Sequence, residues 1–285
     1  MRLFILLLLS FSLMTDIEIT SESLTKEEAI ANLQQTADPS LRYYAAWWLG
    51  RFRVDEPVVI DALEAALEDT DSRSPDGGYP LRRNAARALG KLGNTRVVPA
   101  LTRCLSSDDY YVREAAAQAL AELGDAQCAP DLLALLDGGI EAATQVPGKP
   151  HLTQPYAAII EALGMLRVTE AIAAIQPFID HEFATVKNAA ARALYQLTDD
   201  AQYADRLITT LQGHSLQLRR SALMDLGAIG YLPAAEAIAS ALTENSLKLI
   251  AMKGLMDNHL ACEPSRDLEL TPRAIEVMQL MDGLL

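Results

Sequence analysis

Apolar positions recur along this chain at the spacing of an amphipathic helix, most clearly between residues 106 and 124 (SSDDYYVREAAAQALAELG). The apolar positions of this segment are Val112, Ala116, Ala119, Leu120 and Leu123. Intervals of three and four residues place them on one stripe of a helix. Asp108 and Asp109 precede the stripe, where carboxylates cap free N–H groups and suit the helix dipole. Gly124 provides the expected end.

Six imperfect copies of this helix occur elsewhere in the chain. Aligned on the leucine near the helix end, the seven copies lie at Leu49, Leu89, Leu120, Leu163, Leu194, Leu226 and Leu255. The intervals run from 29 residues (226 to 255) to 43 residues (120 to 163), which is typical of a helical solenoid. Seven positions before these leucines stand Arg42, Arg82, Arg113, Tyr156, Lys187, Arg219 and Lys248. Shorter apolar segments between the copies, such as 97–105, predict a second layer of helices.

The repeated unit is a pair of helices with Asp in the turn and Val-Arg at the start of the second helix, and it resembles the short form of the HEAT repeat. The resemblance covers about residues 25–258. It implies an all-α fold, an α-α superhelix (solenoid) of about seven short HEAT-like repeats. We assign the solenoid to residues 24–260, which leaves no room for a separate globular domain.

The two ends depart from the repeat. Residues 1–13 (MRLFILLLLSFSL) are too short to span a bilayer, and no small-residue cleavage site follows them. We interpret them as an apolar extension from a misassigned start, in preference to a signal peptide, and residues 14–23 as a polar tail. Residues 261–285 are expected to form a linker and a C-terminal amphipathic helix, which either caps the last repeat or docks on a partner.

Two insertions lengthen the turn before an inner helix. They are residues 69–80 (DTDSRSPDGGYP) and 137–155 (DGGIEAATQVPGKPHLTQP). Because equivalent turns of a solenoid line up along one edge, both insertions are expected on the edge that carries residues 108–111. Enlarged loops on a rigid scaffold are where binding function is added, although loop drift is an alternative explanation.

Composition excludes several functions. A net charge of −14 argues against nucleic acid and against an anionic membrane surface, and we expect no membrane span. The cysteines Cys104, Cys128 and Cys262 and the four histidines show no metal-ligand spacing, so no metal site is expected. The cysteines favour a reducing compartment, hence the cytoplasm. Cys104, among apolar residues, is interpreted as a small buried hydrophobe.

Candidate chemistry is concentrated near the starts of the inner helices. Tyrosines occur there at positions 43, 44, 79, 110, 111 and 156, together with arginines at 42, 82, 83 and 113. Aromatic walls with a few cations suit a flat, conjugated ligand that carries carboxylates. An arginine seven residues before the leucine has a structural alternative, a bond to a turn aspartate of a neighbouring repeat. Arg83 and Arg51 lie outside that register and are stronger ligand candidates.

Four longer runs resemble the E-type subunits of the E/F bilin lyases of cyanobacteria. They are RYYAAWWLGRFR (42–53), SPDGGYPLRRNAARALGKLG (74–93), DDYYVREAAAQAL (108–120) and GKPHLTQPYAAIIEALG (148–164). The resemblance spans about residues 25–255. It implies a heterodimer with a homologous F-type subunit that attaches phycocyanobilin, a substrate and not a cofactor, through a thioether to a cysteine of the phycocyanin alpha chain. The phycoerythrocyanin lyase/isomerases have a similar E-type subunit, and these residues do not separate the two.

For such a substrate we assign hypothetical roles. Arg83 and Arg51 would bind the propionates, and Asp76 would bind the pyrrole N–H groups as the one candidate catalytic residue. Stacking is assigned to Tyr79, Tyr110 and Trp48. The remaining bilin-binding candidates are Tyr111, His151 and Tyr156. Since the chain has no nucleophile elbow or phosphate loop, the alternative function is a non-catalytic HEAT-repeat scaffold or chaperone for phycobiliprotein or phycobilisome assembly.

Overall fold

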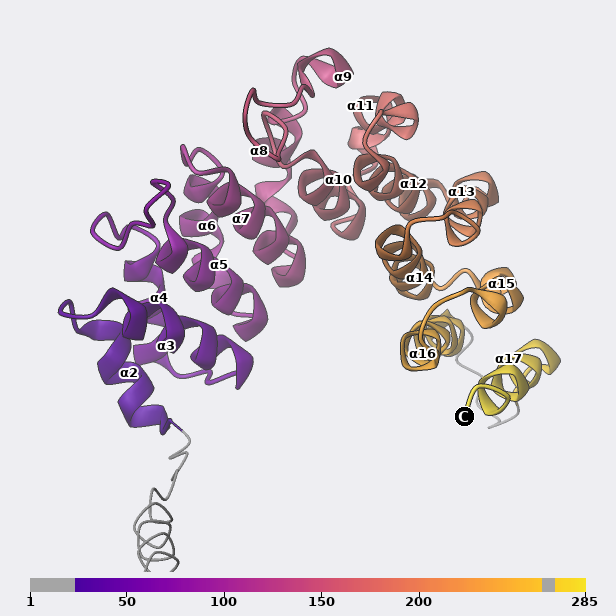
Figure 1. Cartoon of the computed structure of the whole chain (residues 1–285), viewed down its shortest axis with the longest axis horizontal. Helices are drawn as coiled ribbons and strands as arrows, with labels where there is room; N and C mark the ends of the chain where they lie inside the picture. Colours follow the sequence, from indigo (N-terminus) through magenta and orange to yellow (C-terminus); the bar gives the residue numbers. More distant parts are fainter. Residues whose placement is uncertain (1–23, 263–269) are drawn as a thin grey trace, which may run out of the picture.

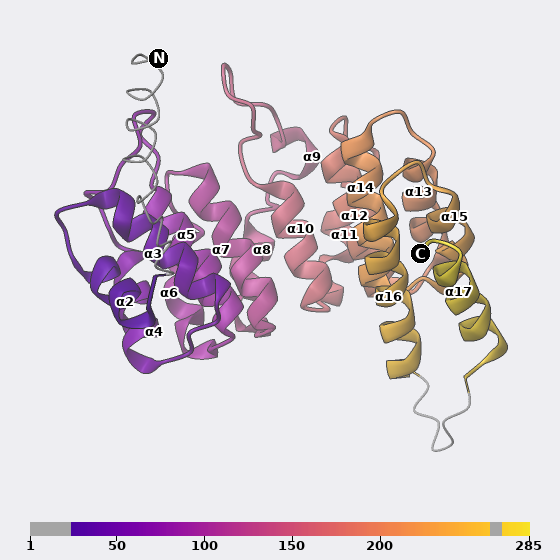
Figure 2. The same cartoon turned by 60° about the horizontal axis from the view of Figure 1, so that its bottom comes forward.

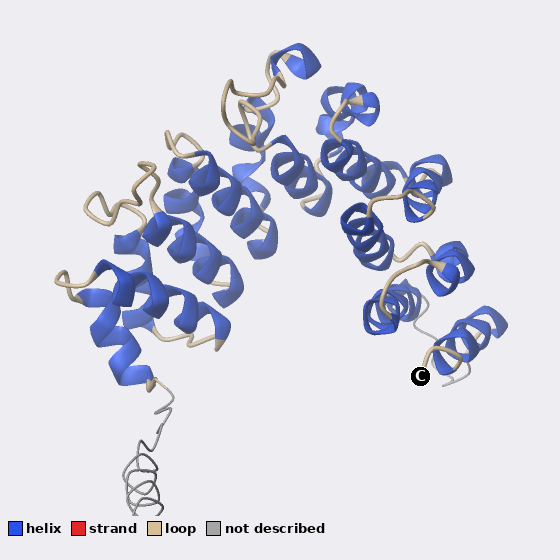
Figure 3. Cartoon of the chain, in the orientation of Figure 1, coloured by secondary structure: helices blue, strands red, loops and turns tan. Residues whose placement is uncertain are grey.

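The computed structural model describes residues 24–262 and 270–285, so the predictions for residues 1–23 and for the linker at 263–269 lie outside the described residues. Within the described ranges the regular elements are helices, and the one β pairing is an isolated bridge between Gln145 and Leu152 (Figure 3). The predicted all-α superhelix of HEAT-like repeats is confirmed.

The helices form two layers that curve into an arch (Figures 1 and 2). The inner layer consists of α3 (Pro39–Arg51), α5 (Pro80–Leu92), α7 (Tyr110–Leu123), α10 (Tyr156–Met165), α12 (Ala184–Thr198), α14 (Leu216–Ile229) and α16 (Asn245–Cys262). The outer layer consists of α2 (Lys26–Gln34), α4 (Pro57–Ala66), α6 (Val98–Cys104), α8 (Ala129–Ala134), α11 (Ile172–Ile175), α13 (Ala201–Leu211) and α15 (Ala235–Ser240). α17 (Pro272–Asp282), in the segment predicted to form an amphipathic helix, packs on α15 and α16.

The core lies between the two layers. All seven leucines on which the repeats align are at most 1% exposed, because the apolar stripe of each inner helix faces the outer layer. Several outer helices are shorter than the apolar pattern suggests, since a 3-10 turn precedes them, as at η1 (Thr95–Val97) and η2 (Ala126–Cys128). Pro99 and Pro130 follow in the first turn of α6 and α8. Proline is tolerated there because the N–H groups of the first turn have no acceptor within the helix.

Glycine brings neighbouring inner helices into backbone contact. Gly50, Gly90 and Gly164 each follow an aligned leucine, and a Cβ at any of them would lie 2.7 Å from a Cα atom of the next inner helix. Ala121 and Tyr195 occupy this position in α7 and α12. At these glycines, therefore, the backbones of neighbouring inner helices approach closely.

Basic residues seven positions before the leucines hold the turns in register. Arg42 contacts the Asp69 carboxylate at 2.5 Å, as expected of a ladder between repeats. Arg82 and Arg113 differ from that expectation, because each donates to backbone carbonyl oxygens, Arg82 to Asp69 and Arg113 to Ser107 and Thr153. Carbonyl groups in these turns lie outside the helices, and guanidinium donors satisfy them.

No helix in the described ranges is long and apolar enough to cross a membrane.

Candidate functional site

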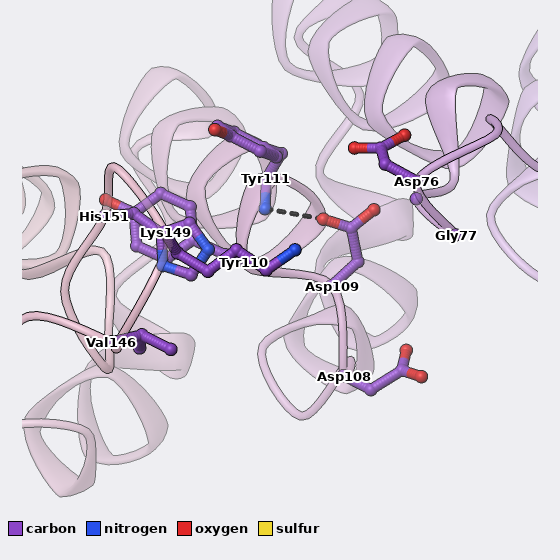
Figure 4. A pocket seen from close by; sticks show the side chains of 10 residues that line it. Asp76, Gly77, Asp108, Asp109, Tyr110, Tyr111, Val146, Lys149 and His151 are labelled. Carbon is purple, nitrogen blue, oxygen red and sulfur yellow. Dashed lines mark hydrogen bonds between the residues drawn. The ribbon is translucent and has the colours of Figure 1, made fainter.

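The two insertions meet beside the N-terminus of α7, and together they form a groove (Figure 4). The groove has two hollows of about 230 and 250 Å³. Asp76, Gly78, Asp109 and Tyr111 line both of them. The predicted convergence of residues 69–80 and 137–155 on the edge that carries residues 108–111 is therefore confirmed.

Asp109 joins the first insertion to α7. Its Oδ1 atom accepts from the Tyr111 N–H at 2.8 Å and caps the helix, while Oδ2 accepts from the Tyr79 N–H at 2.7 Å. A Cβ at Gly78 would lie 3.2 Å from Oδ2, so a side chain there would crowd this contact. The side chain of Asp109 thus fixes the backbone of the first insertion against the start of α7.

The second insertion is a short hairpin that presents His151. It begins with α9 (Gly139–Ala142), and the Val146 N–H donates to the His151 carbonyl at 3.0 Å. Arg113 donates to the Thr153 carbonyl at 2.9 Å, and His181 Nε2 pairs with the Ala143 carbonyl at 3.1 Å. These bonds tie both stems of the hairpin to the solenoid.

Three aromatic rings form one wall of the groove. The imidazole of His151 stacks on Tyr110, with ring centroids 4.2 Å apart and planes inclined by 14°. Tyr111 meets Tyr110 edge-on at 5.3 Å, a favoured geometry for aromatic pairs. Burial, followed by the charge of Glu114, raises the pKa of Tyr110 to about 12, so its phenol is neutral at physiological pH.

Arg83 provides an unpaired cation in the groove. Its guanidinium lies 5.7 Å from the centroid of the Tyr111 ring, and its buried Nε atom has no hydrogen-bond partner among the described residues. A buried donor of this kind suits a carboxylate. On the same side, a hydrogen bond from Ser74 and the nearby charges of Lys149 and Arg83 lower the pKa of Asp76, so an anionic acceptor faces the groove.

Glu114 is a groove neighbour that sequence reasoning missed. It follows Tyr111 by three residues on α7 and lies 4.0 Å from Arg87. Burial raises the pKa of this carboxyl, and the charges of Arg87, Arg83 and His151 oppose that shift. Its spacing from Tyr111 places both on one helix face, which is the only signal in the sequence.

Tyr156, a bilin-binding candidate in the sequence, does not line the groove. Its side chain is 2% exposed and packs against Phe178 with centroids 5.4 Å apart. Tyr156 takes the register of the ladder arginines, and a ring at that position turns into the space between layers. The structure thus places it in the core and away from the groove.

Three further candidates also differ from the expected arrangement. Tyr79 borders the groove, but the guanidinium groups of Arg73 and Arg82 lie over its ring, each 4.2 Å from the ring centroid. Trp48 and Arg51 belong to α3 and do not line either hollow. Trp48 is half-buried against Phe52, with ring centroids 4.6 Å apart.

The two cysteines whose side chains the structure describes are unreactive in character. Cys104 and Cys128 are 7% and 1% exposed, and burial raises the pKa of each thiol to about 11. Cys104 is thus the small buried side chain that the sequence indicates. The described residues also contain no group of three or more His, Cys, Asp or Glu side chains able to hold a metal ion.

The sequence of this chain matches two families of helical repeats. The family "HEAT repeats" matches residues 74–144, and the "PBS lyase HEAT-like repeat" matches residues 41–69 and 218–244. A solved structure, the complex of CpcE and CpcF of phycocyanin lyase from Nostoc sp., contains a chain that is 58% identical. The two chains superpose with a TM-score of 0.85, over 92% of this chain and 95% of that one.

Curated relatives match at similar length. The phycocyanobilin lyase subunit alpha of Synechocystis sp. is 61% identical over 92% of this chain and 96% of its own. That of Picosynechococcus sp. is 59% identical over 93% of this chain and 98% of its own. The bilin biosynthesis protein PecE of Nostoc sp. is 43% identical over 82% and 87%. The chain therefore belongs to the family of phycocyanobilin lyase alpha subunits.

Proposed function

We propose that this chain is one subunit of a heterodimeric lyase, active with a homologous F-type subunit, which attaches phycocyanobilin by a thioether bond to a cysteine of the phycocyanin alpha chain. The observation that carries the proposal is similarity along the whole chain, at 54 to 61% identity to seven phycocyanobilin lyase alpha subunits. The identity to the bilin biosynthesis protein PecE is lower, at 43%. We place the reaction in the cytoplasm.

The groove supplies contacts that a linear tetrapyrrole needs. The free Nε of Arg83 suits a propionate carboxylate, and anionic Asp76 suits a pyrrole N–H group. The His151, Tyr110 and Tyr111 rings offer an apolar wall for a conjugated ring. Each hollow is smaller than the roughly 300 Å³ at which pockets for drug-sized ligands begin. The groove therefore holds one end of the bilin, and the rest extends over the inner layer or the partner subunit.

The acceptor thiol belongs to the substrate protein, so this chain acts by holding the bilin. The subunit holds the ethylidene carbon of the bilin within reach of the incoming thiolate. Positioning two reactants in this way lowers the activation barrier and increases the rate by a large factor. Buried Cys104 and Cys128 agree with this division of labour, because neither thiol is available as a nucleophile.

Reconstitution tests this function. The chain is mixed with its F-type partner, phycocyanobilin and apo-phycocyanin alpha subunit, and the products are denatured. Bilin colour that stays on the alpha subunit, well above the spontaneous background, is the expected result. A folded heterodimer that gives no covalent adduct would contradict the enzyme and favour the scaffold or chaperone function. Apo-phycoerythrocyanin alpha subunit, offered in competition, is expected to be the poorer acceptor.

A further inference from the structure

Lys149 belongs to the hairpin of the second insertion and lines one of the two hollows of the groove (Figure 4). Arg83, on α5, lines the other hollow. The two hollows adjoin, because Asp76 and Tyr111 line both of them. The groove therefore presents one cation in each half, with the Asp76 carboxylate in the part that the halves share.

The backbone that carries each cation is held in place. The Lys149 N–H donates to the Val146 carbonyl at 3.0 Å, and the side-chain amide of Gln145 donates to the Lys149 carbonyl at 2.9 Å. Gly148 has a φ of +74°, which lets the chain turn tightly just before the lysine. Arg83 belongs to the first turn of α5. Both side chains thus extend from fixed positions on opposite sides of the groove.

Neither cation has a side-chain hydrogen bond or an ion pair within the described part of the chain. The Nε atom of Arg83 has no partner there. Lys149 is exposed, and its charge and that of Arg83 act on Asp76 from beyond ion-pair distance. By contrast, Arg73 of the first insertion donates to the Gly77 carbonyl at 2.7 Å. Two cations without acceptors in one groove suit a ligand with more than one carboxylate.

A bilin is such a ligand, since it carries one propionate on each of its two inner rings. Arg51, expected to bind a propionate, lies on α3 and lines neither hollow. The second propionate therefore needs another cation, and Lys149 supplies it in the adjoining hollow. Asp76, in the shared part, suits an N–H donor and repels carboxylates. The two propionates are thus directed apart, one to each side of this residue.

We propose that Lys149 and Arg83 form a clamp that binds the two propionates of phycocyanobilin, one in each hollow. The proposal rests on the proposed function and adds the side chain that binds the second carboxylate. Because the propionates belong to inner rings and the ethylidene group to an outer ring, the clamp leaves the reactive ring outside the groove. The bilin is thereby held by groups that take no part in the new bond, and its reactive end stays accessible to the acceptor thiol.

Esterified bilin tests the clamp, because phycocyanobilin dimethyl ester keeps the conjugated rings and loses both charges. Absorption titration measures the affinity of the heterodimer for each form, without acceptor protein. Wild type should bind the diacid at least about 10-fold more tightly than the ester. Lys149→Gln should bind the diacid about fivefold more weakly than wild type does, the upper range for a partly exposed ion pair. Its affinity for the ester should stay within about twofold of wild type.

Two further comparisons separate two carboxylate sites from one. The double variant Arg83→Gln, Lys149→Gln should bind diacid and dimethyl ester with affinities within about twofold of each other. Each of the two monomethyl esters should be sensitive to the loss of one cation and insensitive to the loss of the other. Lys253→Gln is the matched control, at an exposed lysine of α16 toward the other end of the arch (Figure 1). It should bind every form as wild type does.

Two results would overturn the proposal. A Lys149→Gln heterodimer with wild-type affinity for the diacid has no use for this cation. Equal weakening of the diacid and of the dimethyl ester would reveal a change in the shape of the groove and not the loss of a charge contact. Failure of the proposed function is distinct, because there the wild-type heterodimer forms no covalent product with apo-phycocyanin alpha subunit, whatever its affinity for the bilin.

Discussion

Arg83 is the residue that we propose to bind an anion in the groove. Arg82 of the same helix and Arg113 of the next repeat donate to backbone carbonyl oxygens. The Nε atom of Arg83, in contrast, has no hydrogen-bond partner among the described residues. The difference of one position along α5 turns the side chain from the turn toward the groove. A structural and a ligand-binding arginine can therefore be adjacent in sequence.

Replacing Arg83 with alanine should weaken bilin binding without unfolding the chain. Loss of a hydrogen bond between charged groups costs about 1.5 to 3 kcal/mol, or roughly a 10- to 100-fold rise in Kd by the relation between affinity and free energy. Titration of the heterodimer with phycocyanobilin, followed by absorption, measures it. Arg103→Ala, at an exposed arginine of α6, is the control; equal affinities in both variants would remove Arg83 from the site.

Residue spacing predicted part of this site. Asp76, Tyr110, Tyr111 and His151 were expected at one edge, and the structure brings them together because repeat spacing fixes which turns align. Repeat spacing does not determine the direction in which a ring points. For this reason the spacing did not predict that Tyr156 is buried in the core. The pKa of Glu114 depends on its burial and on the charges of Arg87, Arg83 and His151 from other elements, and no local pattern reports it.

The turn that leads into α7 links two elements through one carboxylate. Asp109 caps α7 and also accepts the Tyr79 N–H of the first insertion, whereas exposed Asp108 makes no hydrogen bond within the described residues. The sequence shows two adjacent aspartates before a helix and predicts a cap. It does not show that one of them also holds a loop 30 residues upstream.

Asp109→Ala should destabilise the protein by about 2 to 4 kcal/mol, because it removes a helix cap and leaves the Tyr79 N–H without its acceptor. Asp108→Ala is the matched control and should change the free energy of unfolding by less than about 0.5 kcal/mol, as expected at an exposed site. Urea unfolding followed by circular dichroism compares the two. Similar midpoints would mean that the cap and the loop contact contribute little.

The arch as a whole depends on how closely the inner helices approach. Repeat spacing was sufficient to predict a two-layer solenoid, since stacked helix pairs bury one continuous core. The close approach of the inner helices depends on glycines that the repeat pattern does not single out, and Ala121 and Tyr195 replace them in α7 and α12. The spacing of the inner helices thus depends on the absence of a few methyl groups.

Gly90→Ala tests this dependence. The new Cβ would lie 2.7 Å from Ala119 Cα, so α5 and α7 must separate. We expect a net loss of about 1 to 2 kcal/mol, because overpacking costs roughly 1 to 3 kcal/mol and the better helix propensity of alanine returns up to about 1 kcal/mol. At Gly283 a Cβ has no neighbour closer than 3.5 Å, so Gly283→Ala should be neutral. Thermal unfolding compares them, and equal Tm values would contradict backbone contact.

The burial of Cys104 and Cys128 has a consequence for an enzyme that carries an electrophile. A chromophore that adds to thiols would also alkylate any accessible thiolate of its carrier, and each such event would inactivate one molecule for good. Thiols with a pKa of about 11 inside the core are neither exposed nor ionised at neutral pH. These two positions are thereby protected from self-modification.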